Sequence, residues 1–297
     1  MRFLCLHGHG TNSQILETQL EPLRAHLPTD WEFDFLDGEM AAEPATGEMI
    51  VQNTPTRCHI TDEYILSIGI DQIFPGPYLC YHGEPVPSDV WNAYNLIMDV
   101  VREEGPFDGV IAFSQGAAVA ATIIAHEAEV NPEADVFKVA VFLSATMPFD
   151  MEAGLLTLMY NGHVDTIEAK YQSQSNAAHC EIDNNVNWLE DCRTAGVIQE
   201  FQARRAHLHG SGRQSIDVLL RYHPSIHDVK IGIPTVHVIG MKDDYADHGR
   251  NLAGICDPKV SRVVTHEGGH QLPRDARTLA KTAEAIQWAV DRTLFLN

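Results

Sequence analysis

Gly109-Val-Ile-Ala-Phe-Ser-Gln-Gly-Ala-Ala-Val-Ala120 is the stretch of the chain that decides the fold. An apolar strand ends at Phe113, Ser114 follows, and a helix of small residues begins at Gln115, which is the strand–turn–helix setting of a nucleophile elbow. The usual pattern is G-x-S-x-G, and Ala112 replaces its first glycine by the smallest possible change. The alternative for a serine in this position is a helix N-cap without a chemical role. Partners elsewhere in the chain must distinguish the two.

Short apolar runs of strand length alternate with helical patterns along the rest of the chain, which is typical of βαβ units on a mostly parallel sheet. Several runs are apolar throughout, as expected where helices cover both faces of a sheet. We therefore predict a doubly wound α/β fold. The expected strands are 2–6, 31–36, 109–113, 138–143, 235–239 and 262–265, and the expected helices are 14–27, 90–103, 115–129 and 278–294.

A serine is a weak nucleophile without a base, and the base needs a carboxylate that fixes its tautomer. The fifth expected strand ends in a glycine turn followed by Asp243 and Asp244, and His270 follows the next strand. The chain order Ser114, Asp243, His270, with each residue on a loop after a strand, is the order of the α/β-hydrolase fold. We prefer Asp243, which is the third residue after the turn glycine. Asp244 and Asp247 stay open as alternatives, because spacing does not show which side chain points inward.

The histidine segment Thr265-His-Glu-Gly-Gly-His-Gln-Leu-Pro273 also contains the pattern H-E-x-x-H, which binds zinc when it lies on a helix. Its two central glycines argue against a helix, because each costs about 0.8–1.0 kcal/mol relative to alanine in a helix interior. Pro273 does not extend a helix begun there. We expect His270 on a glycine-bent loop, His266 as a structural histidine at the end of a strand, and no metal.

The first strand runs into the glycine-rich turn His7-Gly-His-Gly-Thr-Asn12 before the first helix. In the α/β-hydrolase arrangement the turn after this strand donates one backbone N–H to the oxyanion, and the residue after the nucleophile donates the other. We assign the oxyanion hole to the backbone amides of His9 and Gln115. A metal site at His7 and His9 is the alternative, but nothing nearby completes a ligand set.

The composition limits the classes of partner. The 297 residues include 20 basic and 41 acidic side chains, a net charge of −21, and no cluster of Lys or Arg. The chain therefore lacks the electrostatic surface of a nucleic-acid-binding protein. Six dispersed cysteines without a C-x-x-C pair indicate reduced thiols and a cytoplasmic protein. We find no secretory signal and no apolar run long enough to span a bilayer, so no membrane partner is expected.

Two long stretches, at about 39–89 and 148–232, do not fit the simple alternation of strands and helices. Long excursions in a compact domain are usually lids, binding loops or insertions. We expect both to lie over the carboxyl edge of the sheet, where open α/β folds bind ligands, within a single domain that spans 1–297. A helical decoration remote from the site is the alternative.

Five segments carry a resemblance to a known family: Leu6-His-Gly8, Phe35-Leu-Asp-Gly38, Phe74-Pro-Gly-Pro-Tyr78, Glu104-Gly-Pro-Phe-Asp-Gly-Val-Ile-Ala-Phe-Ser-Gln-Gly-Ala-Ala118 and His266-Glu-Gly-Gly-His-Gln-Leu-Pro273. The chain resembles the FSH family of serine hydrolases, relatives of yeast enzymes and of the ovarian cancer-associated protein 2 group, over nearly its whole length outside 148–232. The resemblance implies Ser114 as nucleophile, Asp243 as orienting acid and His270 as base. We expect no cofactor.

Many fungal members of this family are encoded beside polyketide synthases, where they act as thioesterases or hydrolases that release an acyl chain from a carrier protein. The resemblance therefore implies a hydrolase of secondary metabolism that cleaves an acyl thioester or ester through an acyl-serine intermediate. Its favoured substrate is a polyketide-type acyl chain presented by an acyl-carrier protein. The insertion at 148–232 is expected to reshape the acyl pocket.

Two other functions stay open. One is a carboxylesterase that acts on a small free ester, and the other is a non-catalytic binding protein in which the insertion covers the elbow. Acyl-carrier proteins are acidic, so a net charge of −21 opposes the docking of one. A local basic patch would be needed, for which Arg204 and Arg205 are the candidates.

Overall fold

The computed structural model describes residues 1–45, 70–132, 135–160, 167–172, 215–225, 227–228 and 230–294. Within them only the backbone is described for Gln72, 153–160, 167–172 and 215–218. Arg204 and Arg205 lie outside the described residues, as does much of the two long stretches. That these stretches are lids within one domain stays a prediction.

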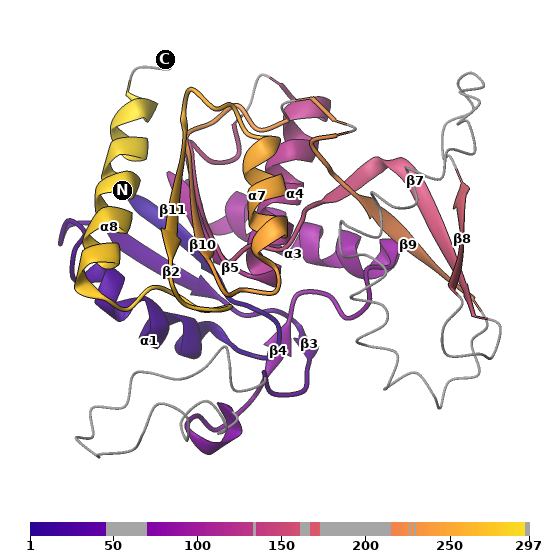
Figure 1. Ribbon diagram of the computed structural model, residues 1–297, viewed down its shortest axis with the longest axis horizontal. Helices are drawn as coiled ribbons and strands as arrows, with labels where there is room; N and C mark the ends of the chain where they lie inside the picture. Colours follow the sequence, from indigo (N-terminus) through magenta and orange to yellow (C-terminus); the bar gives the residue numbers. More distant parts are fainter. Residues whose placement is uncertain are drawn as a thin grey trace.

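The central sheet consists of β1 (Arg2–Leu6), β2 (Glu32–Leu36), β5 (Gly109–Phe113), β6 (Val139–Leu143), β10 (Thr235–Gly240) and β11 (Ser261–His266). All neighbouring pairs are parallel, in the order β11-β10-β6-β5-β1-β2 (Figure 1). The order reverses between β1 and β5, so the carboxyl ends of these two strands flank the switch point at which such sheets bind ligands. The predicted doubly wound α/β fold is confirmed, and the six predicted strands are each present within one residue of the expected bounds.

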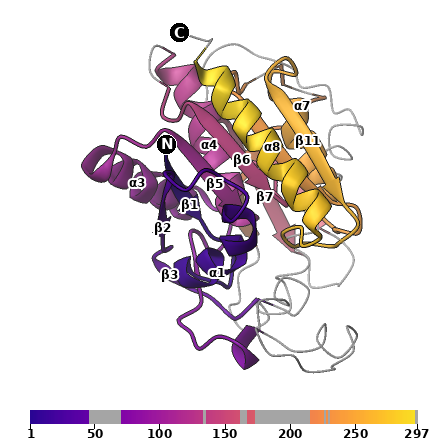
Figure 2. The ribbon, with the colours of Figure 1, turned by 90° about the vertical axis from the view of Figure 1, so that its left-hand side faces the viewer.

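Helices cover both faces of the sheet. They are α1 (Ser13–Arg24), α3 (Pro87–Glu104), α4 (Gln115–Val130), α7 (Ala246–Gly254) and α8 (Ala276–Thr293). The apolar sides of α1 and α8 pack together on one face, and Figure 2, which looks onto it, shows α8 in front of the sheet and running along the direction of the strands. The helices α3, α4 and α7 pack on the other face. Of these five helices, α7 was not predicted, because its sequence ADHGRNLAG has two glycines and a single large apolar residue, Leu252.

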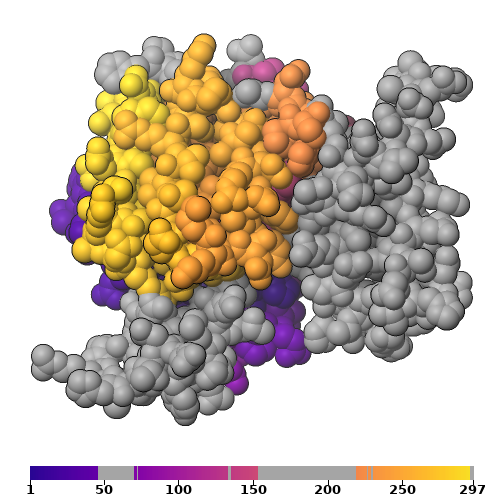
Figure 3. All heavy atoms as spheres, viewed as in Figure 1, coloured from indigo at the N-terminus to yellow at the C-terminus, as the bar shows by residue number. Residues whose placement is uncertain are grey.

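The core lies on both sides of the middle strands. Every residue of β5, β6 and β10 is buried, as expected for strands covered on both faces. The helix that follows β5 is buried from Gln115 to His126 because its alanines allow close packing between α3 and the sheet. On the face shown in Figure 3, the C-terminal segments, orange to yellow, form one continuous surface. Among the described residues, no helix is long and apolar enough to cross a membrane.

The long stretches contain further elements that were not predicted. They are β3 (Met40–Ala41), the short 3-10 helix η2 (Ile70–Gln72), β4 (Leu79–Cys80), β7 (Phe149–Tyr160), β8 (Ile167–Gln172) and β9 (Ser215–Arg221). The last three form an antiparallel sheet in the order β8-β7-β9, which we call the arm sheet. Its strand β7 packs against α4 and its strand β9 against α3. The arm sheet is therefore attached to the α3–α4 face of the domain (Figure 1).

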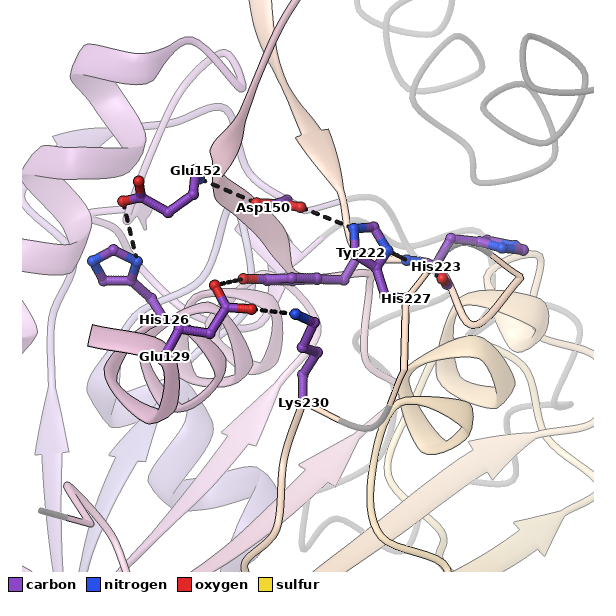
Figure 4. A network of polar contacts seen from close by, with 8 residues as sticks. All are labelled: His126, Glu129, Asp150, Glu152, Tyr222, His223, His227 and Lys230. Carbon is purple, nitrogen blue, oxygen red and sulfur yellow. Dashed lines mark hydrogen bonds and ion pairs between the residues drawn. The ribbon is translucent and has the colours of Figure 1, made fainter. Parts of the chain in front are cut away.

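A network of polar side chains around the buried Asp150 joins the base of the arm sheet to the domain (Figure 4). Asp150 is 5% exposed, and its carboxylate accepts hydrogen bonds from Nε2 of His227 at 2.9 Å and from the amide of Glu152 at 3.1 Å. On the α4 side, the hydroxyl of Tyr222 donates to Glu129 Oε2 at 3.4 Å. Because buried carboxylates are stable only when their oxygens have donors, Asp150 holds β7 to the chain that leaves β9.

Asp150→Ala is expected to lower the free energy of unfolding by about 2–3 kcal/mol, because it leaves two part-buried donors, His227 Nε2 and the amide of Glu152, without their acceptor. Urea denaturation measures the change. The control is Asp247→Ala, which removes a side chain that is 73% exposed and paired only with Arg250, and which should cost under about 1 kcal/mol. Equal losses in the two variants would contradict the anchoring role of Asp150.

Candidate active site

Ser114 lies at the junction of β5 and α4 in a left-handed backbone conformation, with φ 52° and ψ −113°. Such a conformation costs a non-glycine residue about 1–3 kcal/mol, so the surroundings must impose it. The amide of Ser114 donates to the carbonyl of Leu143 at 3.0 Å, which ties the turn to β6. Although Ser114 occupies the N-cap position, its side chain makes no capping hydrogen bond. The alternative of a simple helix cap therefore does not describe this serine.

The residues around the serine are small because the elbow is crowded. A Cβ added to Gly116 would lie 2.6 Å from the carbonyl oxygen of His7 and 2.7 Å from that of Leu6. Its amide donates to the His7 carbonyl at 3.2 Å, so α4 begins directly on the end of β1. Ala112 is fully buried opposite Leu6 and Phe142 on the neighbouring strands. The alanine that replaces the first glycine of the motif is thus accommodated.

His270 connects the serine to an aspartate. Its Nε2 lies 2.8 Å from Ser114 Oγ, and its Nδ1 lies 3.0 and 2.9 Å from the two carboxylate oxygens of Asp243. A carboxylate only accepts, so Nδ1 carries the proton and Nε2 accepts from the serine hydroxyl. Asp243 and His270 are 6% and 7% exposed, whereas Asp244 and Asp247 are exposed. The structure brings Ser114, Asp243 and His270 together in one hydrogen-bonded chain.

Glycines at the ends of β10 and β11 place the aspartate beside the histidine. A Cβ added to Gly240 would overlap the carbonyl oxygen of Gly269 and lie 2.6 Å from that of Gly268. The amide of Lys242 donates to the Gly268 carbonyl at 3.0 Å. The loop after β10 therefore lies on the loop after β11, which brings Asp243 within reach of the imidazole.

Two aromatic rings enclose the imidazole of His270. The ring of Phe113 lies 5.3 Å away between centroids, and the ring of Tyr245 lies 5.2 Å away in an edge arrangement. The amide of Tyr245 also donates to Asp243 Oδ1 at 2.8 Å. The imidazole is therefore held in one plane. Tyr245 was missed in the sequence, although an aromatic residue directly after the two aspartates is a usable signal.

His266 ends β11, as predicted, and residues 267–271 are bent rather than helical. The histidines of the H-E-x-x-H pattern therefore do not share a helix face. Nδ1 of His266 accepts from the amide of Gly268 at 3.1 Å, and burial lowers the pKa of its imidazole. His266 thus shapes the turn that carries His270. Within the described part of the chain, no three His, Cys, Asp or Glu side chains are grouped to hold a metal ion.

The turn after β1, which carries His9, lies directly against the elbow. A Cβ added to Gly8 would meet the ring of Phe113 at 2.8 Å and Cβ of Ser114 at 3.3 Å, so only glycine permits this approach. Gln115 is the first residue of α4, where backbone amides lack acceptors within the helix and the helix dipole is positive. The two amides predicted to bind an oxyanion thus belong to the two segments that meet at the serine.

The side chain of His7 supports this turn from behind. Its Nε2 accepts from the amide of Gly38 at 3.0 Å, so Nδ1 carries the proton and donates to the Gly8 carbonyl at 2.7 Å. The hydroxyl of Thr11 donates to the same carbonyl at 2.7 Å. Burial lowers the pKa of His7, which favours the neutral ring. Both ring nitrogens are engaged by the backbone, which leaves neither one for a metal.

Ser144 is a further residue that sequence patterns missed. It follows β6 as Ser114 follows β5, and it also has a left-handed backbone, with φ 43°. Its amide donates to the carbonyl of Val238 at 2.8 Å, and its hydroxyl donates to the carbonyl of Gln271 at 3.3 Å. Ser144 therefore ties the end of β6 to the histidine loop. A serine directly after an apolar strand was the available signal.

The family model described as Serine hydrolase (FSH1) matches residues 1–282 of this chain. The chain belongs to the FSH1 serine hydrolase family. The resemblance carried by the five segments is confirmed, and the protein is a hydrolase enzyme of the serine hydrolase class.

Curated relatives of this FSH1 protein match it along almost its full length. The hydrolase FUB4 of Fusarium oxysporum f. sp. lycopersici is 34% identical over 288 residues, which cover 96% of this chain and 97% of the relative. The esterase alnB of Emericella nidulans is 28% identical over 310 residues, which cover 98% of this chain and 97% of the relative. Among solved structures, a monoacylglycerol lipase of Paleococcus ferrophilus is 12% identical, with 98% of this chain and 94% of that chain covered and a TM-score of 0.45.

Gly240→Ala is expected to reduce both the melting temperature and ester hydrolysis, because the added methyl would push the loop after β10 away from the histidine loop. A loss of about tenfold or more in kcat/KM is expected, since misplacing a reacting group by about 1 Å costs on the order of 100-fold. Gly232→Ala is the matched control, because a Cβ there meets nothing within 4 Å. Thermal unfolding and hydrolysis of a chromogenic ester measure both effects. An unaffected Gly240→Ala variant would contradict the role given to this contact.

Proposed function

We propose that this FSH1 family member cleaves an acyl thioester or ester through an acyl-serine intermediate, and that its substrate is a polyketide-type acyl chain on an acyl-carrier protein. The observation that carries the chemical part is the chain of hydrogen bonds from Ser114 Oγ to His270 Nε2, 2.8 Å, and from His270 Nδ1 to Asp243, 2.9 Å. In this proposal Ser114 is the nucleophile, His270 the general base and Asp243 the acid that orients the ring.

Acylation follows from the positions of the three side chains. His270 Nε2 takes the proton of Ser114 as Oγ attacks the carbonyl carbon, and Asp243 stabilises the resulting imidazolium. The carbonyl oxygen becomes an oxyanion, which binds the backbone amides of His9 and Gln115. His270 then returns the proton to the leaving thiol or alcohol, and the acyl group stays on Ser114.

Deacylation repeats the same steps with water as the nucleophile. His270 removes a proton from water, the hydroxide attacks the acyl carbonyl, and the proton returns to Ser114 Oγ as the carboxylic acid leaves. No further group is needed, because both half-reactions use one base and one oxyanion site. The neutral ring of His270, hydrogen-bonded to Asp243 through Nδ1, is the form that starts each half-reaction.

An acyl chain as substrate is supported by the apolar segment that follows β6. The amide of Thr146 donates to the carbonyl of Ser114 at 3.5 Å, and Met147 and Phe149 come directly after it and are fully buried. The segment next to the elbow therefore has apolar side chains, with one cation, the buried Arg221, over the ring of Phe149. The carrier protein and the polyketide chain rest on the resemblance to fungal family members. The net charge of −21 opposes docking of an acidic carrier protein, and the candidate patch at 204–205 lies outside the described residues.

A carboxylesterase acting on a small free ester is the second candidate. The relatives alnB of Emericella nidulans and FPY3 of Fusarium mangiferae are both named esterases, and they match 98% and 99% of this chain. Ester and thioester cleavage use the same serine chemistry, so the leaving group and not the catalytic side chains separates the two proposals.

Ser114→Ala and His270→Ala are each expected to lower kcat by on the order of 1,000-fold or more, since the residues of such a triad act as a unit. Asp243→Asn is expected to lower kcat by about 10⁴-fold, because an amide no longer fixes the tautomer of the ring. A fluorophosphonate should label the wild type and not Ser114→Ala. The controls are Ser88→Ala and Asp244→Asn, whose side chains are exposed. Labelling of Ser114→Ala at the wild-type rate would refute the proposed nucleophile.

The substrate is tested by the initial rates on three forms of one acyl chain: the carrier-protein thioester, a short thioester mimic and the ethyl ester. We expect kcat/KM to be highest for the carrier-protein thioester. If hydrolysis is confined to the free ester, the carboxylesterase proposal replaces the carrier-protein one. The Ser114→Ala variant gives the background rate for each substrate.

A further inference from the structure

The side chain of Gln115 makes two hydrogen bonds that the hydrolytic steps above do not use. It is 5% exposed, its Oε1 accepts from the amide of Tyr81 at 2.9 Å, and its Nε2 donates to the carbonyl of His82 at 2.8 Å. A carboxamide has a donor and an acceptor at its end, so it can hold both backbone groups at once. The first residue of α4 is thereby clasped to a segment 33 residues earlier in the chain.

The segment that Gln115 holds, Leu79–His82, is itself hydrogen-bonded to the turn after β1. The amide of Gly10 donates to the carbonyl of Leu79 at 2.9 Å, and the amide of Leu79 donates to the carbonyl of Thr11 at 2.7 Å. Leu79 begins β4, which leads directly into Tyr81. One end of this segment thus holds the turn that contains His9, and the other end is held by Gln115.

Tyr81 adds a second connection to the same turn. Its hydroxyl accepts from the amide of His7 at 3.1 Å and donates to the carbonyl of Leu36 at 2.7 Å. Its ring also lies 4.8 Å from the imidazole of His7. The residue whose amide is held by Gln115 therefore fixes the start of the β1 turn through its side chain.

We infer that Gln115 is a positioning residue. Its side chain holds the segment Tyr81–His82 through two hydrogen bonds, which we call the clasp, and this sets the distance between the two backbone amides of the oxyanion hole. The inference rests on the proposed function, because it needs His9 and Gln115 as the oxyanion donors. Those amides come from segments that are far apart in the chain, and donors are effective only when both lie about 2.7–3.1 Å from the oxyanion. The clasp joins the start of α4 to the turn after β1 through the segment Leu79–His82.

The clasp has a kinetic signature that differs from that of a contact serving only stability. The carbonyl oxygen carries its full charge only in the transition state, so misplaced amides weaken binding of the transition state more than binding of the substrate. Loss of the clasp should therefore lower kcat while KM changes little. A ligand that forms an oxyanion on the serine should lose affinity by the same factor as kcat/KM.

The experiment uses Gln115→Met, which keeps the length of the side chain and removes both bonds, and Gln115→Glu, which keeps the acceptor and loses the donor to His82. Both variants keep the backbone amide of residue 115. The probe is a trifluoromethyl ketone that carries the acyl chain of the ester substrate, to whose carbonyl Ser114 Oγ adds while its proton passes to His270. The control is Gln287→Met, an exposed glutamine on α8 that donates only to the carbonyl of His26 at 3.3 Å.

We expect kcat/KM and the affinity for the ketone to fall together by about 10- to 100-fold in Gln115→Met, with KM within about twofold of the wild type. Gln115→Glu should show the same pattern, and Gln287→Met should match the wild type. If Gln115→Met does not fold, Tyr81→Phe, which keeps the ring and removes only the hydroxyl, should give a smaller loss with the same pattern.

A folded Gln115→Met with wild-type kcat/KM would overturn the inference, and so would a loss of kcat/KM without a matching loss of affinity for the ketone. Neither result would affect the proposed nucleophile, provided that the fluorophosphonate still labels Ser114 in the variant. Activity that survives in Ser114→Ala would instead refute the proposed function. The two failures are therefore distinguishable in one set of variants.

Discussion

The backbone of Ser114 is held at φ 52° between a strand and a helix, and every other part of the site is placed relative to that turn. A non-glycine residue adopts this conformation at a cost of about 1–3 kcal/mol, so the turn persists only because β5 and α4 are both fixed by the core. Both its backbone polar groups are bonded, the amide to Leu143 and the carbonyl to Ala118 in the first turn of the helix. The side chain is thereby turned away from the helix amides, where a serine usually caps, and towards His270.

Parallel strands explain how side chains from distant parts of the chain reach this serine. Ser114 and His270 are 156 residues apart, yet β5, β6, β10 and β11 are neighbours that all end at the same edge of the sheet. Their registers bring Phe113 opposite Leu143, and Gly240 opposite His266. The loop after each strand therefore contacts the loop after the next one. The serine, the aspartate and the histidine require no long excursion to meet, because each follows its strand within four residues.

Much of the fold and of the hydrogen-bonded chain follows from local sequence patterns. The strands were recognisable because buried parallel strands are apolar runs. Ser114 was recognisable because it stands between a strand and small residues, and His270 because it follows a strand and two glycines. The choice of Asp243 over Asp244 was open, since it depends on how closely Gly240 approaches the glycines of the next loop. The two-residue strand β4 has no pattern of its own and exists only through its partners. The carboxamide of Gln115 bonds to backbone groups at Tyr81 and His82, which every residue has, so no residue type marks its partner segment in the sequence.

The departure from G-x-S-x-G at the first position shows where the crowding in the elbow lies. Ala112 sits within β5 between two strands, and its methyl group is buried with the rest of the strand. Gly116 sits where the helix begins, with the carbonyl oxygens of Leu6 and His7 within 2.7 Å of the place a methyl would occupy. The close approach therefore lies between α4 and the end of β1, not between β5 and its neighbours. Because that approach also brings the turn with Gly8 against Ser114, the second glycine of the motif supports the geometry of the oxyanion turn, whereas the first is replaceable by a small residue.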